Sequence, residues 1–363
     1  MMRLEDREWK MFTLEDIFNI LPGKRLEKRN MIAGDRPFIG ASDSNNGLTA
    51  YCGNVNESLD RNVLGINYNG SVCEAFYHAY ECIFSDDVKR FHLKHHEDNK
   101  LVLLFMGVVI RQQKVKYQYA YKFNEQRMRR QVIMLPVAED CQPDYQFMED
   151  YMRELMAAKR KKYRQCVEKR LESLGIDTAN MREYSEALKS CQWKPVPIVS
   201  LFDRFEPGKG KGLNHLEQSE QGITYIGATN RNNGVMCYVK DNGTARKMMQ
   251  EGNCIGFIKN GDGSAGYAIY KQEPFISTSD VIYGYAKWLN LYTGLFFVAA
   301  QDMIEHKYSH GYKRNAQHLK GDRVMLPVTD DGQPDYDFME SFGRKMMINK
   351  YNQYLAFINN AEL

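Results

Sequence analysis

A sixteen-residue segment occurs twice in this chain and constrains its fold more than any other feature. Residues 134–149 and 325–340 are identical at twelve of sixteen positions, without a gap, at an offset of 191 residues. In both segments an apolar run ending in Leu-Pro-Val predicts a strand that stops at a polar turn. The Pro-Asp that follows predicts a helix whose first amides are capped by Asp144 or Asp335. A repeat with this offset predicts two duplicated domains rather than a solenoid.

The similarity extends along most of the two halves. Trp9 and Trp193 open the copies, and each is followed by Ile-Gly-Ala, Asn-Asn-Gly and Asn-Gly. Short apolar runs separated by Asn-Gly predict strands joined by tight turns. The apolar spacing within 101–110, matched by 291–300, predicts a helix packed on the resulting sheet. The fold class expected is therefore α+β, with two duplicated domains that are mainly β with packed helices.

A different kind of sequence follows each copy. Residues 145–174 contain no proline or glycine, and Gly175 is placed to end the helix that their apolar spacing predicts. A short helix is expected over 178–188, and a third helix over 335–363. Equivalent exits from two copies related by a pseudo-twofold axis point in opposite senses, so the long helices are expected to pair antiparallel. The expected segments are 1–143, 144–190, 191–334 and 335–363.

The composition limits the class of protein without choosing one. Apolar content of 43% predicts real cores, and the net charge of +3, from 49 basic and 46 acidic residues, does not demand a nucleic-acid partner. The eight cysteines form no CxxC pair, which predicts reduced thiols in a cytoplasmic protein. The first eight residues are charged, so no signal peptide is expected. The longest apolar run, 101–110, is too short to span a bilayer.

Motifs for catalysis, metals and cofactors are not evident. The chain has no Walker loop, no HExxH, no GxSxG and no Rossmann glycine fingerprint. His92, His95 and His96 have poor spacing for a zinc site, and a solvated loop is expected there. The glycine-rich run 256–266 lacks the Gly-Lys-Ser/Thr ending of a phosphate loop and predicts a hairpin with its backbone near a ligand. We therefore expect no catalytic residue, no metal and no cofactor.

A modest positive signal is repeated in both copies. The pattern Lys-Tyr-x-x-x-Tyr-Lys-x-Asn occurs at 116–124 and 307–315, near further basic residues and amide-rich turns. Basic, aromatic and amide side chains suit contact with phosphates and base edges. The alternative is that the tyrosines are core, the lysines are solvated and the Asn-Gly pairs only form turns. The candidate DNA-binding residues are Lys24, Arg25, Asn45, Asn46, Asn69, Tyr121, Lys122, Arg127, Lys209, Lys211, Asn232, Asn233, Lys259, Asn260, Tyr312, Lys313 and Arg314.

The order of these motifs resembles a known family. Two copies of a Trp-initiated segment with Ile-Gly-Ala, Asn-Asn-Gly, Asn-Gly, Tyr-Lys and Leu-Pro-Val before Pro-Asp-Tyr-x-Phe-Met-Glu, each followed by a helix, resemble the DNA-specificity (S) subunit of type I restriction-modification systems. The resemblance is closest to the compact BcgI-like version, which serves a fused restriction-methylation subunit. It covers nearly the whole chain. The C-terminal helix departs from the pattern, because fewer than thirty residues remain for it.

The resemblance implies a non-catalytic subunit with two target-recognition domains. Each domain would bind one half of a bipartite site on double-stranded DNA, and the helices would space the halves and dock methyltransferase subunits. The spacer would be 144–190, between recognition domains 1–143 and 191–334. The residues expected to dock partners are Phe147, Tyr151, Leu155, Phe338, Phe342 and Met346.

Comparison of the two copies gives a rule for assigning residues. Where the copies agree, the residues are expected to serve scaffold, phosphate or partner, and where matched loops differ they are expected to contact bases. Three such differences are 209–215 against 24–28, 235–237 against 48–50, and 262–266 against 71–74.

Two other classes of function remain open on the residues alone. One is a DNA-modifying or DNA-cutting enzyme with an unrecognised active site, which turnover by the chain alone would reveal. The other is a duplicated carbohydrate- or protein-binding module, whose binding would ignore salt, unlike that of a DNA-binding protein.

Overall fold

The structure of this protein is a computed structural model that describes residues 2–117, 122–174, 181–210, 212–261, 263–309 and 311–360. The chain divides into two compact units, Met1–Gln165 (unit 1) and Cys166–Glu362 (unit 2). The boundary falls inside a long helix, and each unit contains one copy of the repeat.

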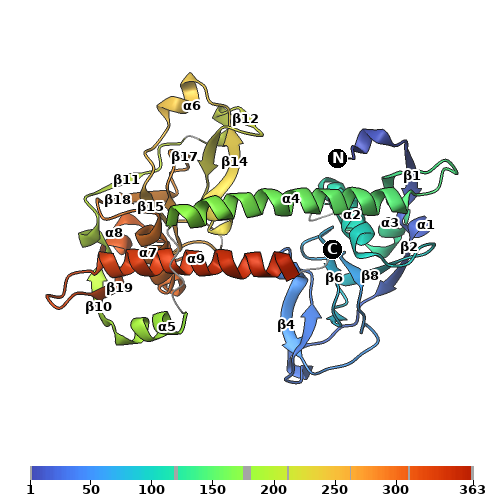
Figure 1. The fold of residues 1–363 in the computed structure, drawn as a ribbon, viewed down its shortest axis with the longest axis horizontal. Helices are drawn as coiled ribbons and strands as arrows, with labels where there is room; N and C mark the ends of the chain where they lie inside the picture. The colour runs from blue at the N-terminus through green and yellow to red at the C-terminus, as the bar shows by residue number, and fades with distance from the viewer. Residues whose placement is uncertain are drawn as a thin grey trace. The chain divides into compact units, whose positions relative to one another are not determined.

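Unit 1 consists of small sheets and a helix that covers one of them (Figure 1). Its elements are β1 (Trp9–Thr13), α1 (Leu14–Ile17), β2 (Phe18–Pro22), β3 (Arg36–Ile39), β4 (Leu48–Cys52), β5 (Val63–Asn67), β6 (Ala75–His78), β7 (Ile83–Phe84), β8 (Val88–Leu93), α2 (Lys100–Arg111), α3 (Glu125–Arg130) and β9 (Val132–Pro136). One antiparallel sheet has the order β2-β8-β5-β6, another sheet has the order β4-β3-β7, and β1 pairs with β9. Helix α2 packs on β6 and β5.

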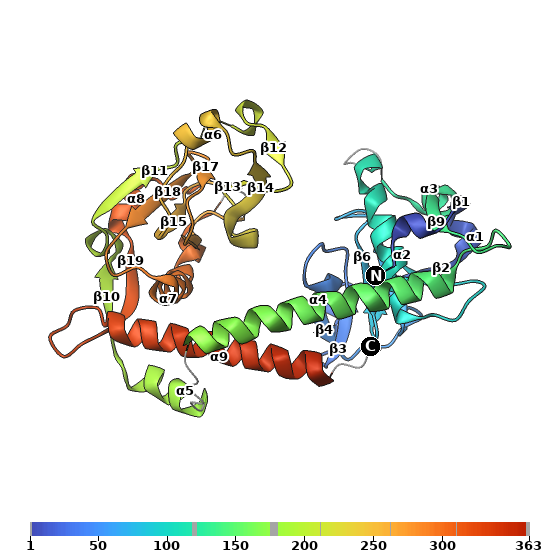
Figure 2. The ribbon, with the colours of Figure 1, turned by 45° about the horizontal axis from the view of Figure 1, so that its top comes forward.

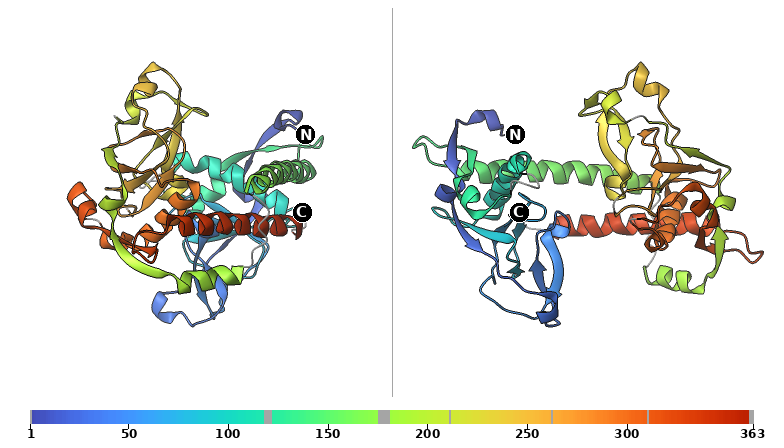
Figure 3. Two further views of the ribbon diagram at one scale, coloured as in Figure 1. Left: turned by 60° about the vertical axis from the view of Figure 1, so that its left-hand side comes forward. Right: turned by 180° about the vertical axis from the view of Figure 1, so that it is seen from behind.

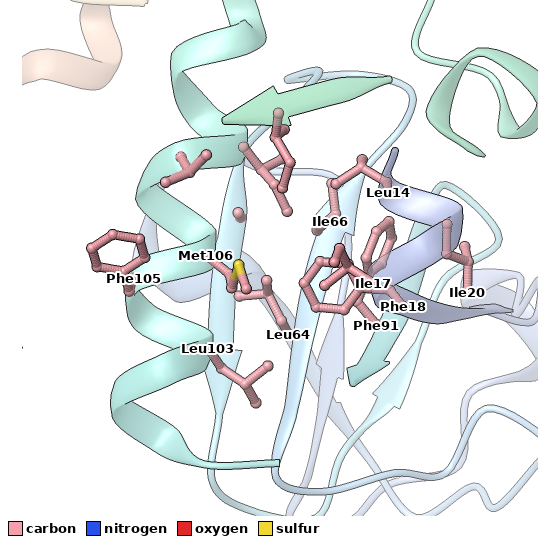
Figure 4. Packing of buried hydrophobic residues seen from close by; sticks show 14 of the residues in the cluster. Leu14, Ile17, Phe18, Ile20, Leu64, Ile66, Phe91, Leu103, Phe105 and Met106 are labelled. Atoms are coloured by element: carbon pink, nitrogen blue, oxygen red, sulfur yellow. The ribbon is translucent and has the colours of Figure 1, made fainter. Parts of the chain in front are cut away.

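The main core of unit 1 lies between α2 and the sheet of β5 and β8 (Figure 4). Leu103 and Met106 of α2 are fully buried, and they point toward the side of α2 where Leu64 of β5 lies. Phe18 and Phe91 meet edge to face, with 5.1 Å between ring centroids. Each such side chain contributes about 1.5–3 kcal/mol on burial, so this layer fixes α2 on the sheet. The helix predicted over 101–110 is confirmed as α2.

Unit 2 repeats this architecture with additions. Its elements are α5 (Met181–Ser190), β10 (Gln192–Pro197), β11 (Arg204–Pro207), β12 (Gln218–Ser219), β13 (Ile223–Ile226), β14 (Val235–Val239), α6 (Gly243–Lys247), β15 (Cys254–Ile258), β16 (Ala268–Lys271), β17 (Ile276–Ser277), β18 (Val281–Tyr285), α7 (Leu291–Asp302), α8 (Ala316–Gly321), β19 (Arg323–Val328) and α9 (Tyr336–Asn360). The sheets have the orders β11-β18-β15-β16, β12-β14-β13-β17 and β10-β19. Within the described residues, unit 1 has no equivalent of β12 or α6, which lie together in Figure 2.

Each copy is closed by pairing its first strand with its last. Trp9 of β1 lies opposite Pro136 of β9, and Trp193 of β10 lies opposite Pro327 of β19. This antiparallel pairing explains why Trp and Leu-Pro-Val mark the two ends of the repeat. In each copy the first and last strands are therefore held together.

The helix caps predicted from the repeated Pro-Asp are confirmed. Asp144 Oδ1 accepts a hydrogen bond from the amide of Phe147 at 2.9 Å, and Asp335 Oδ1 accepts one from the amide of Phe338 at 2.8 Å. These carboxylates satisfy amides that have no partner inside the first turn of a helix.

A second repeated contact ties each exit helix to its own unit. Asn99 caps α2 and donates to Glu149 Oε2 at 2.9 Å, and Asn290 caps α7 and donates to Glu340 Oε2 at 2.9 Å. The glutamate that both copies of the repeated segment share thus orients the exit helix.

The long helices are present where the sequence predicts them. Helix α4 (Tyr145–Leu174) leaves unit 1 without interruption, and α9 extends from the sheets of unit 2 (Figures 2 and 3). The last part of α4 belongs to unit 2, where Arg170 Nη1 donates to Tyr351 Oη of α9 at 2.7 Å. The short helix predicted over 178–188 is present as α5. Residues 175–180, including the predicted stop at Gly175, lie outside the described residues.

One histidine differs from its prediction. His92 lies on β8 between Asp60, 2.9 Å from its Nε2, and Asp98, 2.6 Å from its Nδ1. Hydrogen bonds to these two carboxylates raise the pKa of His92 to about 9. The expected solvated loop is therefore wrong for His92, because two acidic side chains hold the ring at the edge of the core. His95 and His96 are exposed.

Candidate nucleic-acid interface

In each unit, described residues of segments that are distant in sequence are joined by hydrogen bonds or ion pairs. We call them the Asn-Asn-Gly turn (41–47 and 228–234), the hairpin tip (67–74 and 258–266) and the lysine segment (116–124 and 307–315). These segments contain most of the predicted DNA contacts. The hairpin tip is joined to the turn in both units, and it is joined to the lysine segment itself in unit 2 and to Lys114, just before that segment, in unit 1.

In unit 1 the hairpin tip is bonded to the turn and to the residues just before the lysine segment. Asn67 Nδ2 donates to the carbonyl of Ser42 at 2.8 Å, and the amide of Ser71 donates to the carbonyl of Ala41 at 3.2 Å. At the other end of the tip, Glu74 forms an ion pair with Lys114 at 2.5 Å. These bonds fix the positions of the segments relative to one another.

In unit 2 the same neighbours are joined differently. Ser264 Oγ donates to Asn230 Oδ1 at 3.0 Å, which connects the hairpin tip to the turn. The amide of Arg314 donates to the carbonyl of Lys259 at 3.0 Å, which connects the lysine segment to the tip. Lys259 and its neighbour Asn260 are partly exposed beside this junction.

The Asn-Asn-Gly turn has the same frame in both units. Ser42 Oγ accepts from the amide of Ser44 at 3.2 Å, and Thr229 Oγ1 accepts from the amide of Arg231 at 3.2 Å. A hydroxyl that accepts from the amide two residues on fixes a local turn. The two turns therefore hold their backbones alike although most of their side chains differ.

The second asparagine of each turn has a structural role. Asn46 and Asn233 have positive φ angles of 52° and 48°, which asparagine tolerates better than most residues. Asn46 Nδ2 donates to the carbonyl of Tyr77 at 3.2 Å, and Asn233 Nδ2 donates to the carbonyl of Tyr270 at 2.9 Å. One amide hydrogen bond of each fastens the turn to β6 or β16, both side chains are exposed, and their contact with DNA stays a prediction. The first asparagines, Asn45 and Asn232, are exposed.

The lysine segment ends in a repeated cap. Asn124 Oδ1 accepts from the amide of Arg127 at 3.0 Å, and Asn315 Oδ1 accepts from the amide of His318 at 2.8 Å. The asparagine that ends the repeated pattern is therefore an N-cap for α3 or α8. This outcome agrees with the turn-forming alternative for that residue.

The capped helices hold the carbonyl of the exposed lysine. Arg127 Nη1 donates to the carbonyl of Lys122 at 2.8 Å, and His318 Nδ1 lies 2.6 Å from the carbonyl of Lys313, which it can only contact as a donor. Arg127 and His318 occupy matching positions in the two copies. Both lysines are exposed, so the backbone is fixed while the ammonium group extends into solvent.

The tyrosines of the repeated pattern have divided roles. Tyr117 and Tyr308 are buried, as the core alternative states. Tyr312 is 51% exposed and stacks on His318 with 4.4 Å between ring centroids, beside Lys307 in a cleft of about 590 Å³. Tyr121, at the position that matches Tyr312, lies outside the described residues, as does Lys211.

Arg314 is not available to DNA. Its side chain is fully buried, and Nη2 lies 2.8 Å from Asp322 Oδ2. Nε also donates to Asp322, and Nη1 donates to the carbonyl of Gly266 at 3.0 Å. We correct its assignment, because a guanidinium with no exposed surface cannot contact a phosphate.

The remaining DNA candidates lie at the surface with acidic neighbours. Lys24 pairs with Glu57 at 3.1 Å, and Lys209 pairs with Glu206 at 3.5 Å. Arg25 lies 3.8 Å from Glu27 and 3.9 Å from Asp86, and Asn69 donates to Asp87 at 2.9 Å. Exposed ion pairs of this kind are weak, so these cations can exchange an acidic partner for a phosphate.

The loops that differ between the copies are only partly exposed. Residues 48–50 and 235–237 lie on strands β4 and β14, where Thr49 and Met236 face outward. In the third difference, Cys73 and Glu74 are buried and cannot contact a base. The sequence comparison missed a more exposed difference, Ser44 against Arg231, although it directly precedes the shared Asn-Asn-Gly.

Most predicted docking residues pack on their own unit. Phe147 is buried, and Tyr151 meets Phe105 of α2 edge to face at 6.1 Å. Phe338 and Phe342 pack in the same way on Phe296 of α7, at 6.4 and 5.6 Å. Their first role is therefore to seat the exit helices. Leu155 and Met346, farther along α4 and α9, are partly exposed.

The described residues contain no group of histidine, cysteine or acidic side chains placed to hold a metal ion. None of the described helices is both long enough and apolar enough to cross a membrane.

Comparison with protein families gives a match over both copies. The model for the type I restriction modification DNA specificity domain matches residues 6–164 and 192–355. The chain is also 58% identical, over 149 residues, to a type II restriction enzyme specificity subunit, S.BcgI, of Heyndrickxia coagulans. That match covers 41% of this chain and 44% of the relative, so it spans less than half of the relative's length.

Solved structures with some similarity include two specificity subunits. The type I restriction-modification S subunit from M. genitalium is 15% identical with a TM-score of 0.47, over 99% of this chain and 94% of that chain. The HsdS subunit from Thermoanaerobacter tengcongensis is 11% identical with a TM-score of 0.32, over 98% of this chain and 92% of that chain.

Proposed function

Since the chain belongs to the type I restriction modification DNA specificity domain family, we propose that it is the non-catalytic specificity subunit of a restriction-modification complex. Each unit binds one half of a bipartite site on double-stranded DNA. The complex acts in the cytoplasm, and methyltransferase or fused restriction-methylation subunits supply its chemistry. The family match covers both copies, which supports two recognition domains at 1–143 and 191–334.

The observation that best supports DNA contact is the repeated lysine. Lys122 and Lys313 are exposed at matching positions, and a side chain from the next helix fixes the backbone of each. A feature that both copies share cannot distinguish two different half-sites. A shared lysine suits contact with the phosphate backbone, which is the same in every DNA sequence.

Replacing Lys122 or Lys313 by alanine is expected to weaken binding to all DNA sequences alike. Loss of one phosphate contact should reduce the slope of log affinity against log salt concentration by about one. The measurement is a salt titration of binding by the complex with its native partner subunits, using duplexes with and without the methylated site. Lys189→Ala, which removes an exposed lysine of α5, is the matched control and should leave the slope unchanged.

Three results would contradict this account. A change in preferred sequence with intact non-specific affinity would make the lysines base contacts. Binding that ignores salt in the wild type would favour a carbohydrate- or protein-binding module. Turnover by the purified chain alone, with Mg²⁺ or a methyl donor, would instead favour the enzyme alternative.

We also propose that α4 and α9 form the spacer between the half-sites and dock the partner subunits. Arg170 and Tyr351 bond within unit 2, which supports packing of the end of α4 on α9. Leu155 and Met346 remain candidates for partner contact because they are partly exposed beyond the seated first turns.

Lengthening α4 tests the spacer role. Four residues inserted after Ala157 extend the helix by roughly 6 Å, close to two base-pair steps of about 3.4 Å, and keep its faces nearly in register. We expect a longer unspecified spacer in the methylated sites, with both half-site sequences unchanged. Methylated sites are mapped after co-expression with the native partners. An unchanged spacer in an active complex would mean that the helices dock partners without setting the distance.

A further inference from the structure

The Asn-Asn-Gly turns present different side chains on the same frame. Ser44 and Arg231 occupy the same position, directly before the shared Asn-Asn-Gly, and both are exposed. Their amides make the same 3.2 Å bond to the hydroxyl two residues earlier. The preceding residues, Asp43 and Asn230, also differ.

This frame is rigid at the position where the side chains diverge. Gly47 and Gly234 follow with φ angles of 74° and 78°, and their buried backbones hold the end of each turn. Asn46 and Asn233 fasten the turns to the neighbouring strands. A side chain on such a frame begins from a fixed point, which is what selection of one base among four needs.

The position also lies on the surface that contains the lysine segment. The turn bonds to the hairpin tip, and in unit 2 the tip bonds to the lysine segment. A phosphate contact at Lys313 therefore brings the DNA to the region in which Arg231 is exposed. In unit 2, Lys313 is shared with the other copy and Arg231 differs from it, and hydrogen bonds through the hairpin tip connect their two segments.

We propose that position 44 in unit 1 and position 231 in unit 2 are matching base-contact positions, and that Arg231 selects guanine. The proposal rests on the proposed function and adds a residue and a base to it. An arginine can donate two hydrogen bonds to O6 and N7 of guanine in the major groove, which the other bases do not accept in the same way. Ser44 is shorter and can donate or accept, so the first half-site lacks this guanine requirement at the matching position.

The competing role for Arg231 is a phosphate contact. The Arg231→Lys variant distinguishes a guanine contact from a phosphate contact, because lysine keeps the positive charge but lacks the planar pair of donors. A phosphate contact would tolerate Arg231→Lys, whereas selection of guanine through two hydrogen bonds would be weakened by it.

The test is the methylated sequence in cells that express the full chain with its native partner subunits. In Arg231→Ser we expect the preference for guanine at one position of one half-site to fall roughly ten- to hundredfold, with the other half-site unchanged. Arg231→Lys is expected to lose most of the same preference. Arg246→Ser, an exposed arginine of α6 in the same unit, is the control and should leave the site unchanged.

The reciprocal change is Ser44→Arg. Because the two turns share one frame, this variant is expected to gain a guanine preference at one position of the other half-site. It tests the assignment independently if Arg231→Ser fails to assemble.

An unchanged site in an assembled Arg231→Ser complex overturns the assignment. So does a uniform loss of methylation that Arg231→Lys restores, because that is the behaviour of a phosphate contact. Absence of any bipartite methylated site in the wild type overturns the proposed function itself and is distinguishable from both.

Discussion

Replacing Arg314 by alanine is expected to destabilise unit 2 by about 3–5 kcal/mol, because it breaks a buried ion pair and leaves the Asp322 carboxylate with the Tyr308 hydroxyl at 2.8 Å and the Lys307 ammonium at 3.8 Å. The guanidinium lies 2.8 Å from Asp322, and it also donates to Gln301 and to the carbonyl of Gly266. Asp322 is 3% exposed, so solvent hardly screens the carboxylate in the native structure.

In the first copy, uncharged residues occupy the positions of the buried Arg314–Asp322 ion pair. Phe123 stands at the position of Arg314, and Gln131 stands at the position of Asp322, where it accepts from Tyr117 Oη at 2.6 Å. Ile110 matches Gln301. We therefore expect the triple variant with Arg314→Phe, Asp322→Gln and Gln301→Ile to recover most of the stability lost by the alanine variant.

Hydrogen exchange of the full chain measures this effect unit by unit. Peptides of unit 2 should lose protection in Arg314→Ala, while peptides of unit 1 serve as the internal control. Protection should return in the triple variant, since replacing a buried ion pair by well-packed residues is often neutral or stabilising. A loss of less than about 1 kcal/mol in the alanine variant would show that the site admits water and that the pair contributes little.

The sequence predicted those features that both copies repeat. The Asp144 and Asp335 caps, the helix over 101–110 and the exit helices all depend on local chemistry that recurs at the same offset. Repetition removes much of the ambiguity of a single pattern. The pairing of the first strand with the last was not predicted, although Trp and Leu-Pro-Val mark the two strands in both copies.

Residues whose roles depend on distant partners were not predictable. Arg314 belongs to a basic pattern in sequence, and only the fold places Asp322, Gln301 and Gly266 around it. In the sequence, the alignment of Arg314 with Phe123 of the first copy was a signal that this position lies in the core. Asn46 is exposed, but the carbonyl that its amide contacts, on Tyr77, is thirty-one residues away and could not be identified from the sequence.

Exchanging a whole recognition domain is expected to change one half-site completely. Residues 9–143 replaced by the equivalent domain of another such subunit should alter one half of the site and leave the other. The chain also supplies its own donor, residues 193–334. The change should be separable because each copy is closed by its own strand pair.

The repeated contacts at the junctions support this exchange. In the chimera that carries 193–334 in place of 9–143, Asn290 can donate to Glu149 as Asn99 does in the native chain. Trp193 donates to the Leu188 carbonyl at 3.0 Å, and Trp9 donates to the Leu4 carbonyl at 2.9 Å, so the imported tryptophan finds a matching acceptor.

The methylated sequence of this chimera tests most directly whether each unit recognises one half-site independently. The chimera and the native chain are co-expressed with the native partner subunits, and their methylated sites are mapped. We predict that the native chain gives two different half-sites around an unspecified spacer, and that the chimera gives the half-site of unit 2 at both ends. Loss of both half-sites in a folded, assembled chimera, or retention of the native site, would contradict independent recognition.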